Sequence, residues 1–341
     1  MKKSYPKVLS LLLALTMVLV MMLSGCTAEE PAPPAVATGS TDKVDVSNEE
    51  YVWISCLSGF PLFVENDQVG LKKFGEEYGV KVTIAGPSEY DIAGTVKTIE
   101  EVIARKPAGI MVLGMESSLT GGINKIVEAG IPCVVVDADI STSKRQAFIG
   151  TDWYDVGIAH AEQMVKHTGG KGKVAVVYIK GAENMELALK GYKEYLQAYP
   201  EMTVVDAFNS ESNPEVAARV TADILAAYPD IAGISGFDGA TPGIGTALKE
   251  AGKAGKIAVT GMNVDAAQIG LLEEGVFNSL VGQKRQLFTY YGAKLLYDMN
   301  HSPASVSKDD KALGVTNIPV NINTGIFIVD KDNVKAFKGE K

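Results

Sequence analysis

The chain of 341 residues has few of the residue types that build metal sites. It contains three Cys and three His, none of them clustered, so no ligand set for a structural zinc ion is visible. We therefore expect no metal and no cofactor. Basic residues are also scarce, because 32 Lys and Arg face 41 Asp and Glu. An acidic chain without a basic cluster argues against nucleic acid as a partner.

Catalytic signatures are missing as well. The sequence has no Walker-type Gly-Lys-Ser/Thr loop and no Gly-x-Ser-x-Gly elbow. Its three His, at positions 160, 167 and 301, suggest no nucleophile–base pair. Asp137 and Asp139 could in principle act as acid and base on a glycoside. Two carboxylates so close on one strand would more naturally hold hydroxyl groups, so we expect no enzyme.

The N-terminus reads as an export and anchoring device. Lys residues open the chain, an apolar run covers 8–23, and Leu23-Ser24-Gly25-Cys26 resembles the bacterial lipobox. The alternative is a transmembrane anchor, but about 16 apolar residues are few for a hydrocarbon core of about 30 Å. We expect residues 1–25 to be a lipoprotein signal peptide and Cys26 to carry the lipid. The mature protein would then lie outside the cytoplasm, attached to the bacterial membrane.

A tether should follow the lipid. Residues 26–48 mix Pro with Gly, Ser and Thr and contain nothing that could bury a core. The remaining chain of nearly 300 residues exceeds the usual size of one core, so two lobes are expected. Cys56 and Cys133 sit in apolar runs, which favours buried free thiols over a disulfide.

Short apolar runs alternate with amphipathic segments in two consecutive series. Runs without polar alternation suit parallel strands covered on both faces, which predicts an α/β fold with two doubly wound parallel-sheet lobes. Strands are expected at 51–57, 80–85, 109–113, 132–137, 173–179, 203–208, 231–235 and 257–260, with late strands ending at 283 and covering 325–329. Helices are expected at 62–78, 92–105, 119–129, 187–198, 214–228, 244–251, 265–274 and 286–299.

Three crossings between the lobes give the most economical chain path, and we expect them near 150–152, 281–283 and 312–318. The N-terminal lobe would then combine 49–151 with 284–312. The C-terminal lobe would combine 152–283 with 313–335.

In open parallel sheets, the loops at the carboxyl ends of the strands form the binding crevice. Carboxylates and amides at those ends can bind hydroxyl groups, and aromatic faces can stack on a sugar ring. Asp238 and Asp265 could instead cap helices, and Phe63 could belong to a core. The candidate ligand-binding residues are Ser55, Phe60, Phe63, Asp137, Asp139, Asn184, Glu186, Phe237, Asp238, Asn263 and Gln283.

The markers Phe60-Pro61-Leu62-Phe63, Ile131-Pro132 before Val136-Asp137, Tyr228-Pro229-Asp230 and Gly282-Gln283 occur in a characteristic order. With that order, the chain resembles the type I periplasmic binding proteins, in the branch of ribose, galactose, rhamnose and autoinducer-2 receptors. The resemblance covers residues 51–329. It implies a ring-stacking role for Phe63, a hydroxyl-binding carboxylate at Asp137 and a hinge-side amide at Gln283.

Two departures concern the ligand. Ala138 stands where ribose-type receptors have an Arg, and Glu186 lies near the position of their second Arg. Ribose therefore cannot be assumed, and Asp137-Ala138-Asp139 looks more like the rhamnose and autoinducer-2 receptors. Nearby carboxylates also leave room for an amine-bearing ligand.

The resemblance implies a monomeric solute-binding protein that closes on a small sugar or sugar-like ligand and delivers it to the permease of an ABC importer. The alternative is a sensor that signals to a membrane kinase or chemoreceptor. The sequence does not separate these two functions.

Overall fold

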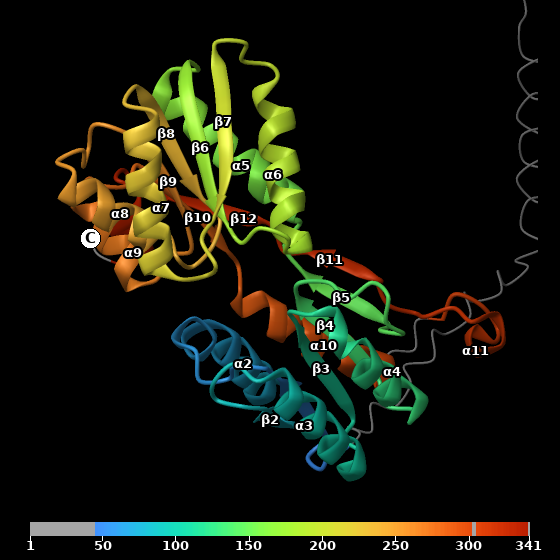
Figure 1. Cartoon of the computed structure of the whole chain (residues 1–341). Coiled ribbons are helices and arrows are strands. Elements are labelled where there is room, and N and C mark those ends of the chain that lie inside the picture. Colours follow the sequence, from blue (N-terminus) through green and yellow to red (C-terminus); the bar gives the residue numbers. More distant parts are fainter. Residues whose placement is uncertain (1–44, 302–304, 340–341) are drawn as a thin grey trace, which may run out of the picture. The chain divides into compact units, whose positions relative to one another are not determined.

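The computed structural model describes residues 45–301 and 305–339, and this part of the chain holds two six-stranded sheets (Figure 1). The first sheet has the order β11-β5-β4-β3-β1-β2, and every pairing in it is parallel. Its lobe comprises β1 (Glu50–Ile54), the π-helical turn η1 (Phe63–Asp67), α2 (Gln68–Tyr78), β2 (Lys81–Ala85), α3 (Ile92–Arg105), β3 (Gly109–Gly114), the 3-10 turn η2 (Ser117–Leu119), α4 (Thr120–Glu128), β4 (Cys133–Asp137), β5 (Ala147–Gly150), α10 (Gln286–His301), α11 (Asp310–Leu313) and β11 (Asn321–Asn323).

The second sheet has the order β12-β10-β9-β8-β6-β7, and β12 is its one antiparallel strand. Its lobe comprises α5 (Trp153–Thr168), β6 (Gly172–Tyr178), α6 (Glu183–Leu196), β7 (Met202–Asn209), α7 (Pro214–Ala227), β8 (Ile231–Gly236), α8 (Pro242–Glu250), β9 (Ala258–Met262), α9 (Ala266–Glu273), β10 (Ser279–Gln283), β12 (Ile326–Asp330) and α12 (Val334–Phe337). The predicted fold of two doubly wound α/β lobes is confirmed.

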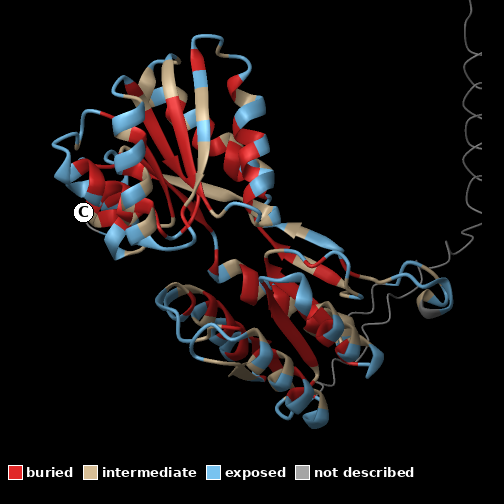
Figure 2. Ribbon diagram, in the orientation of Figure 1, coloured by how far each residue is buried: buried red, intermediate tan, exposed pale blue. Residues whose placement is uncertain are grey.

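Each sheet separates two apolar cores. In β1, Tyr51 and Trp53 point into one core, and Val52 and Ile54 point into the other. Successive side chains of a strand face opposite sides, so burial on both sides requires a continuous apolar run. Figure 2 shows the result as buried strands at the centre of each lobe. The two Cys of these lobes, Cys56 and Cys133, are buried free thiols, as predicted.

The chain passes between the sheets at three places, after β5, after β10 and after β11. The first and third passages are bonded to each other. The backbone N–H of Thr324 donates to the carbonyl of Gly150 at 2.9 Å, and the Asn323 side chain accepts from the backbone N–H of Asp152. Two neighbouring strands that leave the sheet together thus form one joined connection.

The predicted third crossing at 312–318 is wrong. β11 pairs with β5 in the first sheet, and Ile318 lies in the core of the first lobe, so this passage falls at Thr324 and Gly325. Residues 313–323 therefore belong with the N-terminal lobe. The sequence analysis also failed to anticipate β5, α5 and β11. β11 has three residues of intermediate or full exposure, too few and too polar to give a strand pattern.

The predicted signal peptide, Cys26 and most of the tether lie outside the described residues. Across 45–301 and 305–339, we find no helix that combines the length and the apolar character needed to traverse a bilayer.

A buried polar chain crosses the core of the second lobe. His160 Nδ1 lies 2.9 Å from Thr260 Oγ1, which donates to Ser235, and Ser235 in turn donates to the Tyr192 hydroxyl. His160 Nε2 has no partner among the described residues. Burial lowers the pKa of His160 to about 3. The native state therefore holds this imidazole neutral, whereas the unfolded state protonates it below about 6.5.

This difference predicts a loss of stability in acid. Between pH 6.5 and 3 the unfolded chain binds a proton at His160 that the native chain does not, so the free energy of unfolding falls by up to about 1.4 kcal/mol per pH unit. His160→Gln should reduce this slope in urea unfolding measured from pH 7.5 to 5. His301→Gln is the control. An unchanged slope in His160→Gln would contradict the assignment.

Candidate functional site

Two strand ends, one in each sheet, have an unusual backbone. Asp137 ends β4 with φ +79°, and Asn263 directly follows β9 with φ +73°. A residue other than glycine in the left-handed region costs on the order of 1 kcal/mol or more and persists where its surroundings fix it. Both residues were predicted to bind ligand, and both lie at carboxyl ends of strands, where open sheets bind ligands.

Asp137 is one wall of a buried ionic cluster around Arg285. Arg285 lies in the passage from β10 to α10 and is 5% exposed. Its Nη1 and Nη2 donate to the two carboxylate oxygens of Asp137 at 3.1 and 2.9 Å. Its Nε and Nη2 donate to Asp67 at 2.9 and 3.0 Å, and Nη1 also donates to Gln283 Oε1 at 3.3 Å. One guanidinium thus joins η1, β4 and β10.

Burial makes the charges of this cluster interdependent. It raises the pKa of Asp67, which is fully buried, to about 6, although Arg285 pulls that pKa down. Burial acts to lower the pKa of Arg285, but Asp137 and Asp67 together raise it above its usual range. Buried charges are tolerated where they are paired and hydrogen-bonded, and the fork geometry of Arg suits two carboxylates.

Aromatic rings adjoin the cluster. The guanidinium lies 4.7 Å from the ring centre of Phe63, which is 4% exposed and meets Phe60 edge-on at 5.6 Å. Phe60 is 46% exposed. Phe63 therefore supports Arg285 and the core around Trp53, while Phe60 offers its ring to solvent at the same edge. Phe63 thus contacts Arg285, the partner of Asp137, and Phe60 contacts Phe63.

Two other candidates of the first lobe have partners of their own. Ser55 is fully buried, and its hydroxyl accepts from the backbone N–H of Leu57 at 3.2 Å, which shapes the turn after β1. Asp139 receives two hydrogen bonds of 2.5 Å from the Arg145 guanidinium. Neither joins the cluster around Arg285.

The candidates of the second lobe lie at the carboxyl ends of its strands. Glu186, in the first turn of α6, accepts from the Tyr178 hydroxyl and from the backbone N–H of Gly181. Asn184 lies half-buried in the same turn. Asp238 is buried and accepts from the Ser210 hydroxyl and the Ala240 backbone N–H. Burial raises the pKa of Asp238.

The two capping possibilities have different outcomes. Asp265 is the N-cap of α9, because its carboxylate accepts from the backbone N–H groups of Ala267 and Gln268. The N-cap of α8 is Thr241, so Asp238 fixes the preceding turn instead of the helix end.

Phe237 requires a correction. Its ring is 0% exposed and packs between His160 and Tyr192, with ring centres 4.8 and 5.6 Å away. A ring enclosed in this way has no face left for a sugar. The residue follows β8 directly, and its side chain turns back into the core of the lobe.

Asp67 and Arg285 were missed by the sequence analysis. Asp67 lies in a predicted helix, where an acidic residue usually faces solvent. Arg285 had a weak signal, because it stands two residues after Gln283, at an expected crossing in an acidic chain. Pairing across 218 residues of sequence is a tertiary contact that local patterns do not contain.

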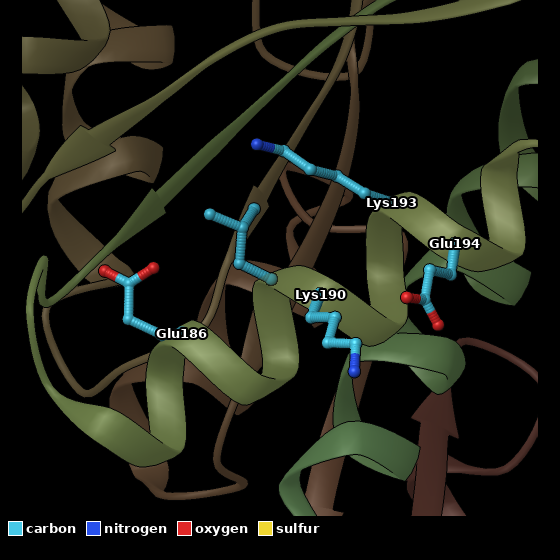
Figure 3. Close-up of a pocket in the computed structure, with 5 residues that line it drawn as sticks. Glu186, Lys190, Lys193 and Glu194 are labelled. Carbon is cyan, nitrogen blue, oxygen red and sulfur yellow. The ribbon is translucent and has the colours of Figure 1, made fainter.

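A separate surface hollow of about 360 Å³ lies along α6 (Figure 3). It is lined by Glu186, Leu189, Lys190, Lys193 and Glu194. All five belong to one helix, and Glu186 alone among them was a predicted ligand residue. Charges of both signs on one exposed helix face are usual for solvated surface, so the hollow does not define the site.

Comparison with known proteins places this geometry in a family. Residues 52–301 match the model of the periplasmic binding protein domain. The D-allose-binding periplasmic protein of Escherichia coli K12 is 25% identical over 272 residues, which cover 76% of this chain and 87% of that protein.

Two solved structures are similar throughout. The sugar-binding protein of a sugar ABC transporter from Bacillus halodurans has 28% identity and a TM-score of 0.80, and the match covers 85% of this chain and all of that one. An arabinose-binding protein from Geobacillus stearothermophilus has 30% identity and a TM-score of 0.78, with 85% and 99% covered. With its two doubly wound lobes and a family match over most of its length, this chain is a member of the periplasmic binding protein domain family, whose members bind solutes and are not enzymes.

Proposed function

We propose that this protein captures a small sugar between its two lobes and delivers it to an ABC importer. The observation that carries the proposal is the joint position of Asp137 and Gln283, a carboxyl group and an amide held by the same guanidinium. Such a pair suits hydroxyl groups, which both donate and accept. The relatives are named for allose and arabinose, both of which carry hydroxyls on successive carbons.

Transport is favoured over sensing by the same comparisons. The relative from Bacillus halodurans is described as part of a sugar ABC transporter. Capture would work by closure about the passages after β5, β10 and β11, because a ligand that touches both lobes only in the closed state shifts the population toward closure. The expected contacts are Asp137, Gln283 and Phe60 on one side and Asn184, Glu186, Asp238 and Asn263 on the other.

A thermal-shift screen of pentoses, hexoses, deoxysugars and amino sugars tests the function. At a sugar concentration of 100 times Kd, binding should stabilise the protein by about 2.7 kcal/mol. The same sugar should reduce the radius of gyration in X-ray scattering. A screen in which no sugar raises Tm would contradict sugar capture, and an unchanged radius with a bound sugar would contradict closure.

Asp137→Asn should weaken binding of the sugar that raises the wild-type Tm most by roughly tenfold to a hundredfold. The reason is that an amide nitrogen replaces a carboxylate oxygen that accepts from a hydroxyl. The Tm without sugar should fall only moderately, because one guanidinium N–H loses its acceptor while Arg285 keeps Asp67 as a counter-ion. Calorimetric titration and thermal unfolding measure the two effects. Asp230→Asn is the control, because Asp230 pairs with Lys173 at the amino ends of strands β8 and β6, away from the carboxyl ends. Equal losses of stability and affinity would make Asp137 structural.

The proposed anchor is a lipid on Cys26, with residues 26–48 as a tether that keeps the receptor near its permease. Cys26→Ser should move the protein from the membrane fraction to the soluble fraction, as measured by fractionation and immunoblotting. Ser40→Ala, in the same segment, should leave it attached. Retention of Cys26→Ser in the membrane fraction would mean that another element anchors the chain.

A further inference from the structure

Arg285 has no hydrogen-bond donor left for a ligand. A guanidinium carries five N–H groups. The single N–H of Nε goes to Asp67, the two of Nη2 go to Asp67 and Asp137, and the two of Nη1 go to Asp137 and Gln283. Every donor is therefore committed to a side chain of the protein.

Two aromatic rings also lie against this guanidinium. Its central carbon lies 4.7 Å from the ring centre of Phe63 and 5.2 Å from that of Phe288. Phe288 is fully buried, and Arg285 itself is 5% exposed. Because every N–H is committed and the residue is 5% exposed, Arg285 has no N–H and little surface to offer a sugar.

Asp137 and Gln283, which Arg285 holds, still have hydrogen-bonding positions that the protein does not use. Each oxygen of the Asp137 carboxylate accepts one hydrogen bond from Arg285, and a carboxylate has about four acceptor positions. The amide of Gln283 accepts from Nη1 through Oε1, while its Nε2 is buried and has no partner among the described residues. The bond to Oε1 fixes which end of the amide faces away from Arg285.

We propose that Arg285 is a positioning residue that sets a hydroxyl acceptor, Asp137, beside a hydroxyl donor, Gln283 Nε2. Both side chains accept a hydrogen bond from the same nitrogen, Nη1. They therefore suit two neighbouring hydroxyls of a sugar, one that donates to Asp137 and one that accepts from Gln283 Nε2. This inference rests on the proposed function and names its ligand class, a neutral vicinal diol. The positive charge of Arg285 already balances the negative charge of Asp137. Asp137 and Gln283 together are therefore a poor site for an ammonium group.

Asp67 binds the guanidinium of Arg285 on the side away from the proposed ligand. Its two oxygens take Nε and Nη2, and its side chain has no exposed surface. The rotation of the guanidinium is therefore fixed, because two carboxylates grip two edges of one plane. A Lys at this position carries the charge but cannot bridge both carboxylates and Gln283 in one plane.

The test uses D-allose or arabinose, whichever raises the wild-type Tm more. Arg285→Lys should retain a Tm near that of the wild type and bind this sugar at least tenfold more weakly. In an Asp137→Asn background, the same change should weaken binding by no more than a few-fold further, because Arg285 acts through Asp137. Two results would overturn the inference. One is wild-type affinity in Arg285→Lys, and the other is a loss of affinity in the double variant that equals the product of the losses in the two single variants.

Two further variants separate positioning from folding. Asp67→Asn with Arg285→Gln removes the cation together with its buried counter-ion, and it should unfold near the wild-type Tm while binding the sugar weakly. If this double variant bound the sugar as tightly as the wild type does, the inference would be overturned. Arg145→Lys is the matched control. Arg145 also donates two hydrogen bonds to one carboxylate, that of Asp139, and also lies over an aromatic ring, that of Phe148. It should bind as the wild type does.

The outcomes also separate this inference from the function on which it rests. A wild-type protein that binds no sugar of the screen, D-allose and arabinose included, overturns both. A wild-type protein that binds, together with an Arg285→Lys variant that binds equally well, overturns the inference alone. Binding of glucosamine at least tenfold tighter than the neutral sugar would overturn the assigned ligand class.

Discussion

Parallel pairing of strands that are buried on both faces is the constraint on which this structure depends. Parallel strands leave all their carboxyl ends at one edge, and helices that cover both faces leave that edge as the place where polar side chains can gather. Asp137 and Asn263 occupy that edge in the two lobes, each in a left-handed conformation. The site follows from the architecture before any ligand is considered.

The cluster around Arg285 fixes the orientation of polar side chains at this edge. Asp137 alone would be a carboxylate near water with a free rotamer. Held by Arg285, it presents fixed lone pairs, and the same guanidinium orients the amide of Gln283. Buried ion pairs contribute little net stability because desolvation offsets their attraction. Under the proposed function their benefit is geometric, since a paired and immobilised group loses little freedom when a ligand binds.

Arg285 also lies where the chain passes from one lobe to the other. It lies between the last parallel strand of the second sheet and a helix that packs on the first sheet. Any rotation about this passage must either carry the guanidinium with the first lobe or strain its bonds to Asp67 and Asp137. Four of its five bonds go to the first lobe, and the fifth goes to Gln283, the last residue of β10, two positions earlier in the chain.

The sequence by itself determined the class of fold, most strand positions, the free thiols, and the place of Asp137 at a strand end. These follow from local rules, because apolar periodicity, strand ends and turns are written within a few residues. Tertiary structure alone decided the rest. The burial of Phe237, the pairing of Asp139 with Arg145, the return of β11 to the first sheet, and the grip of Arg285 on Asp67 all depend on which segments meet. A side chain at a strand end can turn toward solvent or core, and packing between segments distant in sequence settles which.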